Sequence, residues 1–359
     1  MKQAVPPFAH DWEILGDPNL AMQLGEPRQP QIRSMLQRAR HFYLLALLML
    51  PTVAFGIELT WPVACKLGET CAVQHYVDRD AGPGAEDYQC GTVTYDGHNG
   101  TDIRLPTMAA QAAGVDVLAA AAGRVLRRRD DMRDVSVRSA GAPDVAGRQC
   151  GNGLVIAHED GWETQYCHMA QGSLRVQPGQ TVKAGEPLGK IGVSGDSEFP
   201  HLHFAVRRDG KLVDPFALDA APGSCGGGQS IWASAVRAMF HYHAGEVLNS
   251  GFSSAPVTMT DIEEATPKAP ARDAAMLIAF VHAIGLRKGD IQHLTLTSPN
   301  GEILADTARP PLDNNKAQYM MFIGKKNRTA LWPAGEYLAR YTVTREDRVA
   351  IQKKFTLTF

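Results

Sequence analysis

Short apolar segments, broken by glycine, proline or aspartate, follow one another through residues 57–220. The clearest pair covers 154–158 and 162–166, which the dipeptide Asp160-Gly161 separates. Asp-Gly between two such segments is a strong signal for a tight hairpin turn. Frequent glycine and proline in the other segments suit sharply bent strands. We therefore predict an all-β, antiparallel first domain of sandwich or barrel-like form.

The pattern changes after the glycine-rich stretch 222–228, which is typical of a linker. Residues 231–243 then show helical spacing, with four large side chains near one face: Trp232, Val236, Met239 and Phe240. Beyond them, turn residues separate five alternating segments, at 275–283, 292–297, 319–323, 337–344 and 351–359. Short strands with such turns predict a second antiparallel sandwich of immunoglobulin-like type.

Two segments of the first domain do not follow the strand pattern. Residues 107–122 are rich in alanine but contain glycine and β-branched residues, and we expect a mixture of loop and strand there. The segment 127–147 is charged and dotted with glycine and proline. Two interpretations of it stay open: a solvent-exposed loop, or a loop at the rim of an active site that touches the substrate.

Near the N-terminus, basic residues precede a continuous apolar run. Arg38 and Arg40 are followed by the apolar residues 42–50, and small residues close the segment. A basic start, a short apolar centre and a small-residue end are the parts of a secretory signal peptide. The run is shorter than the ~20 residues that a membrane-spanning helix needs. We interpret residues 35–56 as a signal peptide, with an uncleaved signal anchor as the alternative.

These patterns divide the chain into five parts. We predict an extension at 1–34, the signal segment at 35–56, the first β domain at 57–222, a linker with a short helix at 223–245, and the second sandwich at 246–359. The extension has two interpretations, an over-long start assignment upstream of Met35 or a cytoplasmic segment.

Composition agrees with an exported globular protein and argues against nucleic-acid binding. The 359 residues are 44% apolar and 21% charged, and the net charge is −2. No basic field is available for a polynucleotide. All six cysteines follow the signal segment, and none is spaced as Cys-x-x-Cys. An even number of cysteines behind an export signal predicts disulfides formed in an oxidising compartment, with their pairing left open.

His201 and His203 share one face if residues 201–206 form a strand, because side chains alternate along a strand. The opposite face is then apolar, and its burial fixes the direction of both histidines. His241 and His243 have the same spacing but fall in the predicted helix, where positions two apart do not share a face. We interpret that second pair as structural or surface residues.

Other residues complete a candidate metal site. His98 and Asp102 flank a turn-prone Asn-Gly-Thr, and together with the His-Leu-His string they supply imidazole and carboxylate donors. Three such ligands hold a single zinc ion and leave a position open for water, as in catalytic zinc sites. His168 ends the second strand of the predicted hairpin, where Thr164, Tyr166 and His168 are expected to point the same way.

From His98 to Pro215 the chain resembles the lysostaphin-type (LytM-like) zinc peptidoglycan endopeptidases. The resemblance covers roughly a third of the chain and rests on seven motifs in the family's order and spacing: HNGTDI from His98, GLVIAH from Gly153, YCHM from Tyr166, VQPGQTV from Val176, GVSG from Gly192, PHLHF from Pro200 and VDP from Val213. It implies an antiparallel β architecture with the zinc in a groove between strands and loops.

The resemblance also implies roles for five residues. His98, Asp102 and His203 would be the metal ligands of one Zn²⁺ per chain. His168 and His201 would be the catalytic pair that does not bind the metal, and which of them is the general base stays open.

Two positions depart from the family pattern. Phe199 stands where the family often has glycine, and Ala205 stands where glutamate is frequent. Neither is a ligand, so both bear on the shape of the site rather than on metal binding. They leave open which group orients His203 through its second ring nitrogen.

The function implied by the resemblance is zinc-dependent endopeptidase cleavage of peptidoglycan peptide cross-links. An export signal favours the periplasm of a Gram-negative bacterium, where D-Ala–diaminopimelate cross-links predominate, so we expect a DD-endopeptidase. The alternative is a non-enzymatic or weakly active module that regulates another cell-wall hydrolase. The expected partners are the peptidoglycan peptide and a cell-wall protein bound through the C-terminal domain. A membrane is a partner only if the signal segment stays uncleaved, and nucleic acid is not one.

Overall fold

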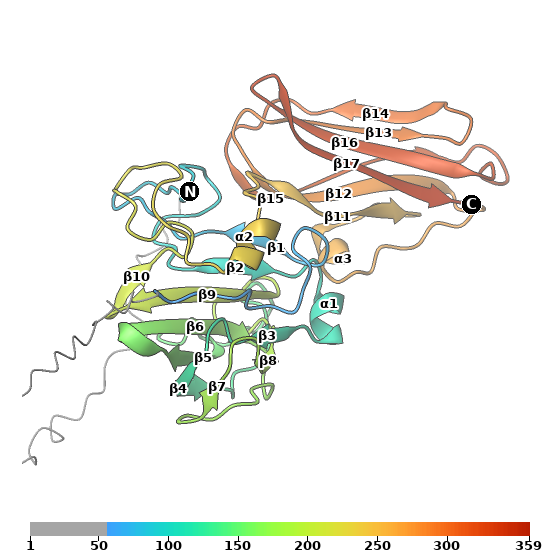
Figure 1. Ribbon diagram of the computed structural model, residues 1–359. Coiled ribbons are helices and arrows are strands. Elements are labelled where there is room, and N and C mark those ends of the chain that lie inside the picture. Colours follow the sequence, from blue (N-terminus) through green and yellow to red (C-terminus); the bar gives the residue numbers. More distant parts are fainter. Residues whose placement is uncertain (1–55) are drawn as a thin grey trace, which may run out of the picture.

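The structure of the protein is a computed structural model that describes residues 56–359 (Figure 1). The predictions for the N-terminal extension and for the signal segment, apart from Gly56, lie outside these residues. Within the described part of the chain, we find no helix long and apolar enough to span a membrane. Strands dominate and helices are few and short, as predicted for the all-β class.

The first half of the described chain is built on one antiparallel sheet of eight strands. Seven strands follow the order β1-β2-β9-β6-β5-β4-β7, and β10 pairs with β9. The sheet is open, with β1 and β7 at its edges, so it does not close into a barrel. The strands are β1 (Ala72–His75), β2 (Thr101–Arg104), β4 (Gly123–Arg129), β5 (Asn152–Ala157), β6 (Trp162–Met169), β7 (Thr181–Val182), β9 (His201–Arg208) and β10 (Lys211–Val213), and a separate pair consists of β3 (Asp116–Leu118) and β8 (Pro187–Lys190).

One face of the large sheet covers the larger of the two main hydrophobic cores. Leu202, Phe204 and Val206 on β9 are fully buried there, which confirms the alternation predicted for this strand. Tyr166 on β6 pairs with Phe204 and lies on the same face. The polar residues that alternate with these therefore project from the other face. The predicted hairpin is present as β5 and β6, joined by the short 3-10 helix η1 (Glu159–Gly161).

Helix α1 (Met108–Ala113) corrects part of the expectation for residues 107–122, where we predicted loop and strand. The Thr107 hydroxyl accepts a hydrogen bond from the backbone N–H of Ala110 and so caps the first turn. Gly114 ends the helix in the left-handed region, at φ 85°. The alanine-rich stretch between these caps is a good helix former, and the strand expected after it is β3.

Helix α2 (Ser234–Met239) is shorter than the predicted helix over 231–243. Trp232 and Val236 are buried in the first core, whereas Met239 is 45% exposed. The predicted apolar face is therefore wrong at Met239. Trp232, which is only 1% exposed, anchors this segment to the first half of the chain.

The C-terminal sandwich, which we define as strands β11–β17, has two antiparallel sheets. One is β11 (Glu246–Ser253), β12 (Met276–Leu286) and β15 (Lys316–Lys326); the other is β14 (Ile303–Ala308), β13 (Ile291–Thr297), β16 (Glu336–Arg345) and β17 (Arg348–Thr358). Both sheets contribute to the second core, for example through Leu277 and Val281 from one and Leu294 and Tyr341 from the other. This arrangement is compatible with an immunoglobulin-like sandwich. The five predicted strands are present, and β11 and β14 were not predicted.

A short helix, α3 (Met259–Glu263), follows β11. In Figure 1 the sandwich lies above the first sheet, on the side of β1, β2 and α1. All six cysteines form disulfides, which pair Cys65 with Cys71, Cys90 with Cys225, and Cys150 with Cys167. This agrees with the prediction of disulfides and settles the pairing that the sequence left open.

Candidate metal centre

The candidate site lies where β2 pairs with β9. Asp102 stands opposite His203, and Arg104 stands opposite His201. Their neighbours along both strands are core residues, so these four side chains project from the other face of the sheet. His98 lies in the loop just before β2 and reaches the same place.

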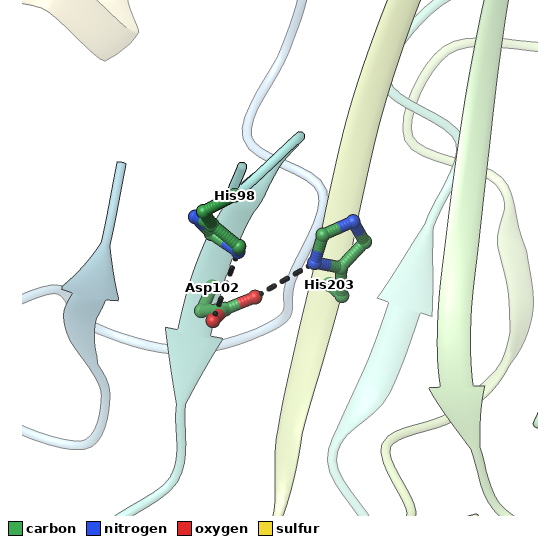
Figure 2. A group of neighbouring side chains, drawn as sticks. All are labelled: His98, Asp102 and His203. Atoms are coloured by element: carbon green, nitrogen blue, oxygen red, sulfur yellow. Dashed lines mark hydrogen bonds and ion pairs between the residues drawn. The ribbon is translucent and has the colours of Figure 1, made fainter. Parts of the chain in front are cut away.

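Asp102 connects two of the predicted metal ligands (Figure 2). Its Oδ2 lies 3.2 Å from His98 Nε2, and its Oδ1 lies 2.9 Å from His203 Nδ1. One donor atom from each of the three residues lies within 4.8 Å of the others. Burial alone would raise the pKa of Asp102, but the surrounding imidazoles hold it well below its usual range. The carboxylate is therefore ionised and ready to bind a cation.

Hydrogen bonds on the far side of each imidazole set its tautomer. His98 Nδ1 donates to the carbonyl oxygen of Tyr76 at 2.6 Å, and His203 Nε2 donates to Asn99 Oδ1 at 3.0 Å. In the neutral ring, the nitrogen that faces Asp102 is therefore free to bind a metal ion, whereas in the protonated ring it would donate to the carboxylate instead. Asn99 is the group that orients His203, a role that the sequence left open.

His98 Nε2 provides a test of whether these residues fit a metal ion. The atom is buried and makes no hydrogen bond within the described residues, although it lies beside Asp102. A buried nitrogen whose lone pair meets no donor is costly unless a ligand uses it. Gly100 allows the loop to pass close to His203, because a Cβ at this position would lie 2.6 Å from Nε2 of that ring. Two imidazoles and one carboxylate in this arrangement fit a divalent transition metal.

The two histidines predicted as the catalytic pair lie beside the three donors. The ring centroids of His168 and His201 are 4.5 Å apart, and that of His168 is 5.9 Å from that of His203. His201 Nε2 lies 3.6 Å from Asp102 Oδ1. The structure thus brings all five predicted site residues together.

His168 and His201, the predicted catalytic pair, are each held in one tautomer. His168 Nδ1 lies 2.8 Å from the carbonyl oxygen of Ser194, and His201 Nδ1 lies 2.9 Å from that of Phe199. A carbonyl only accepts hydrogen bonds, so both Nδ1 atoms carry the proton and both Nε2 atoms are free. Burial lowers the pKa of His168 well below its usual value and that of His201 to about 4. Both rings are therefore neutral near pH 7.

His168 reaches the site in a different way from the one predicted. Tyr166 points into the core opposite Phe204, and strict alternation would send His168 to the same face. A β-bulge between β5 and β6 and a left-handed backbone at His168, with φ 60°, turn the side chain to the face of His201 instead. The expectation that Thr164, Tyr166 and His168 point the same way was therefore wrong for His168.

Sequence reasoning did not find two other residues at the site, His75 and Arg104. His75 Nδ1 lies 3.1 Å from Asp102 Oδ2, and no motif marks this histidine. The guanidinium of Arg104 lies 3.8 Å above the ring of Phe199, whose centroid is 5.0 Å from that of His201. Phe199, one of the two departures from the family pattern, thus packs an aromatic ring against His201, and only the tertiary contacts reveal it.

The charged segment 127–147 borders the site. Val137 N–H donates to the carbonyl oxygen of Ser197 at 3.0 Å, and the Ser136 hydroxyl donates to that of Glu198 at 2.9 Å. Ser197 and Glu198, whose carbonyl oxygens accept these bonds, directly precede Phe199 and lie close in sequence to His201. The placement favours a loop at the rim of the site over a loop remote from it.

His241 and His243 lie elsewhere. Both are exposed, and neither belongs to a group of donors in the described residues that could hold a metal ion. This agrees with their interpretation as structural or surface residues.

Comparisons with known proteins match the part of the chain that contains the five predicted site residues. The model of Peptidase family M23 matches residues 96–215. The chain is 40% identical over 71 residues to the cell division protein DipM of Caulobacter vibrioides, covering 18% of this chain and 11% of that protein. It is 30% identical over 122 residues to the peptidoglycan DD-endopeptidase ShyB of Vibrio cholerae, covering 34% of this chain and 23% of that protein.

Among solved structures, the chain is similar to the catalytic domain of lysostaphin from Staphylococcus simulans. The identity is 25%, the match covers 37% of this chain and 86% of that one, and the TM-score is 0.25. The chain spans less than a quarter of the length of DipM and of ShyB.

An open antiparallel sheet that brings two imidazoles and a carboxylate together defines an all-β protein with a candidate metal centre. The match over residues 96–215, which contains all five site residues, places this part of the chain in Peptidase family M23, the family of the lysostaphin-type peptidases.

Proposed function

We propose that this chain is a zinc-dependent endopeptidase that hydrolyses peptide cross-links of peptidoglycan, with D-Ala–diaminopimelate as the bond that it cleaves. The observation that carries the proposal is the cluster of three donor residues beside two imidazoles with free Nε2 atoms. We assign His98, Asp102 and His203 as zinc ligands and His168 and His201 as the catalytic pair. Membership of family M23 and the similarity to a peptidoglycan DD-endopeptidase support the substrate class.

A zinc ion held by the three ligands would act as a Lewis acid toward the scissile carbonyl and the attacking water. The chain's own residues supply the proton transfers. Nε2 of His168 or His201 accepts the proton of the water, because neither atom carries hydrogen in the neutral ring. The same nitrogen then donates this proton to the leaving amine. A neutral Nε2 has no hydrogen for a developing oxyanion, so such a bond comes only from a ring that has been protonated.

We also propose that the protein works in the periplasm after export through residues 35–56. Three disulfides in the described chain suit an oxidising compartment. In this proposal the peptidase domain covers 57–222, the linker covers 223–245, and the C-terminal domain covers 246–359. The last of these contributes a surface for a cell-wall partner.

Two substitutions on the same strand test the proposed roles. His203→Ala removes a ligand, so we expect it to lose both zinc and activity. His201→Ala leaves the three ligands intact, so we expect it to keep one zinc per chain while turnover falls about 10²–10⁴-fold. Elemental analysis of the purified proteins gives the zinc content, and release of soluble peptide fragments from purified murein gives the activity.

The exposed His241 offers a matched control, and His241→Ala should retain both properties of the wild type. Full activity in His201→Ala would refute its catalytic role. Wild-type protein that binds zinc but releases no fragments from murein would refute the enzyme and support a regulatory module of the cell wall.

A further inference from the structure

The pairing between β1 and β2 is irregular next to the metal site. Val73 pairs with Ile103, and a regular register would then place Gln74 opposite Asp102. The structure has a β-bulge here, and His75 stands opposite Asp102 instead. A bulge inserts one extra residue and changes the face to which the following side chain points. It therefore brings His75 to the face that carries the donor cluster.

His75 contacts the metal ligands from this edge of the sheet. Its Nδ1 lies 3.1 Å from Asp102 Oδ2, and its ring packs edge-on against His98 with 5.6 Å between the centroids. The ring centroid of Tyr95 lies 5.1 Å from that of His75 and 4.6 Å from that of His98, and 13% of the His75 side chain is exposed. Asp102 thus has His203 at Oδ1 and both His98 and His75 at Oδ2.

We propose that His75 is a positioning residue for the metal site, which holds the Asp102 carboxylate through a hydrogen bond from Nδ1 to Oδ2. Partners of this kind fix the orientation of a ligating carboxylate and so contribute to metal affinity. This inference rests on the proposed metal site and adds to it a residue outside the motif that supplies the ligands. Without His75, Asp102 would keep its place on β2, but its carboxylate could rotate about the side-chain bonds.

The bulge that presents His75 is itself held in place. Gln74, the extra residue, accepts a hydrogen bond at Oε1 from Arg104 Nη1, at 2.9 Å. Its Nε2 donates to the carbonyl oxygen of Ala317 on β15, also at 2.9 Å. The position of His75 therefore depends on a contact with the C-terminal sandwich.

Two substitutions of His75 separate positioning from packing. His75→Ala removes the donor, and we expect the dissociation constant for zinc to rise about 10–100-fold. His75→Asn places an amide nitrogen near the position of Nδ1, and we expect it to restore most of the affinity. Zinc affinity is measured by competition with a chromogenic chelator, and the visible spectrum of the Co²⁺-substituted protein reports the ligand geometry. His241→Ala, at an exposed histidine, is the control and should match the wild type.

A changed Co²⁺ spectrum in His75→Ala, together with an unchanged melting temperature of the metal-free protein, would support positioning. Equal zinc affinity and equal spectra in His75→Ala and the wild type would overturn the proposal. It would also be overturned if His75→Asn were as weak as His75→Ala and both melted early without metal, since the role would then be packing. If the wild-type protein itself did not bind zinc, the proposed metal site would be refuted. This result differs from a failure of the His75 proposal, in which the wild type still binds zinc.

Discussion

Each imidazole of the site is committed to one tautomer by the partner of its outer nitrogen. His98 binds a backbone carbonyl through Nδ1 and presents Nε2, whereas His203 binds Asn99 through Nε2 and presents Nδ1. His168 and His201 repeat the first arrangement with two other carbonyls. The proposed division between metal ligands and proton carriers therefore does not follow from the tautomer, which His98 shares with His168 and His201, but from which rings belong to the three-residue donor cluster.

Asp214 illustrates the cost of a single buried carboxyl. Its Oδ1 accepts a hydrogen bond from Phe216 N–H at 2.9 Å, but its Oδ2 is buried and makes no hydrogen bond within the described residues. Burial raises its pKa from 3.8 to about 6. A carboxyl that binds its proton more tightly in the folded state stabilises the fold fully below its unfolded pKa, and this contribution is lost as the pH rises through the folded pKa.

Asp214→Asn should remove this pH dependence. We expect the variant to match the wild type near pH 4, and to be more stable by about 2 kcal/mol at pH 7.5, since one pKa unit corresponds to about 1.4 kcal/mol. Thermal unfolding of both proteins at a series of pH values measures the difference. A difference in stability that stays constant from pH 4 to 7.5 would show that the Asp214 carboxyl does not titrate in this range.

At the level of elements, the end of β6 depends on a disulfide. Cys167 precedes His168, and the bond to Cys150 joins this strand to the turn before β5. His168 N–H donates to the carbonyl oxygen of Cys150 at 2.8 Å. The left-handed backbone of His168 is unfavourable for a residue with a side chain, so it persists only where its surroundings hold it. The disulfide is one of these restraints.

We expect the double variant Cys150→Ser, Cys167→Ser to lose about tenfold or more in activity, because a small displacement of a catalytic group has a large effect on rate. Its zinc affinity should stay within about twofold of the wild type, since neither cysteine is one of the three proposed ligands. A loop of 17 residues also predicts a loss of about 3 kcal/mol in stability.

The disulfide between Cys65 and Cys71 provides the control, because it closes a separate loop of 6 residues. The variant Cys65→Ser, Cys71→Ser should keep its activity on murein. If both double variants lost activity equally, a specific effect of the first disulfide on His168 would be disproved.

At the scale of the whole molecule, Arg104 joins the candidate metal site to the C-terminal sandwich. It is 1% exposed, stands opposite His201, and donates through Nη1 to Gln318 at 2.8 Å and through Nη2 to Glu263 at 3.0 Å. Burial lowers its pKa to about 10, so it stays charged near neutral pH. The two halves of the chain therefore share a buried cation that lies two residues along β2 from Asp102, the partner of His203.

Glu263→Ala should leave this cation without its carboxylate. Removing one partner of a fully buried ion pair costs about 3–5 kcal/mol, and we expect about 2 kcal/mol here because the Glu263 side chain is 23% exposed. Thermal unfolding measures the change. Asp313→Ala, at a carboxyl that is 81% exposed and paired with Lys316, should leave the melting temperature close to that of the wild type, because solvent screens such a pair. Equal effects of the two substitutions would contradict a structural role for the interdomain pair.

The sequence predicted five residues that the structure brings together, but it did not predict the residues that surround them. His98, Asp102, His168, His201 and His203 stand in motifs of fixed spacing, and the strand alternation placed the β9 histidines correctly. His75 and Glu263 were missed because they approach the site through pairing and packing across long stretches of sequence, which no local pattern encodes. Helix α1 was missed because its propensity competes with the β-branched residues that follow.

The spacing of residues in the sequence by itself determined the all-β class, the main hairpin, the candidate donors and the presence of disulfides. Each of these depends on a pattern along one or two strands. Tertiary structure alone decided which nitrogen of each imidazole faces the cluster, how a bulge and a left-handed residue bring His168 to it, and how a second bulge brings His75. It also decided that Arg104 ties the site to the sandwich. These features arise where segments distant in sequence meet, and there the free energy of burial and hydrogen bonding overrides the local pattern.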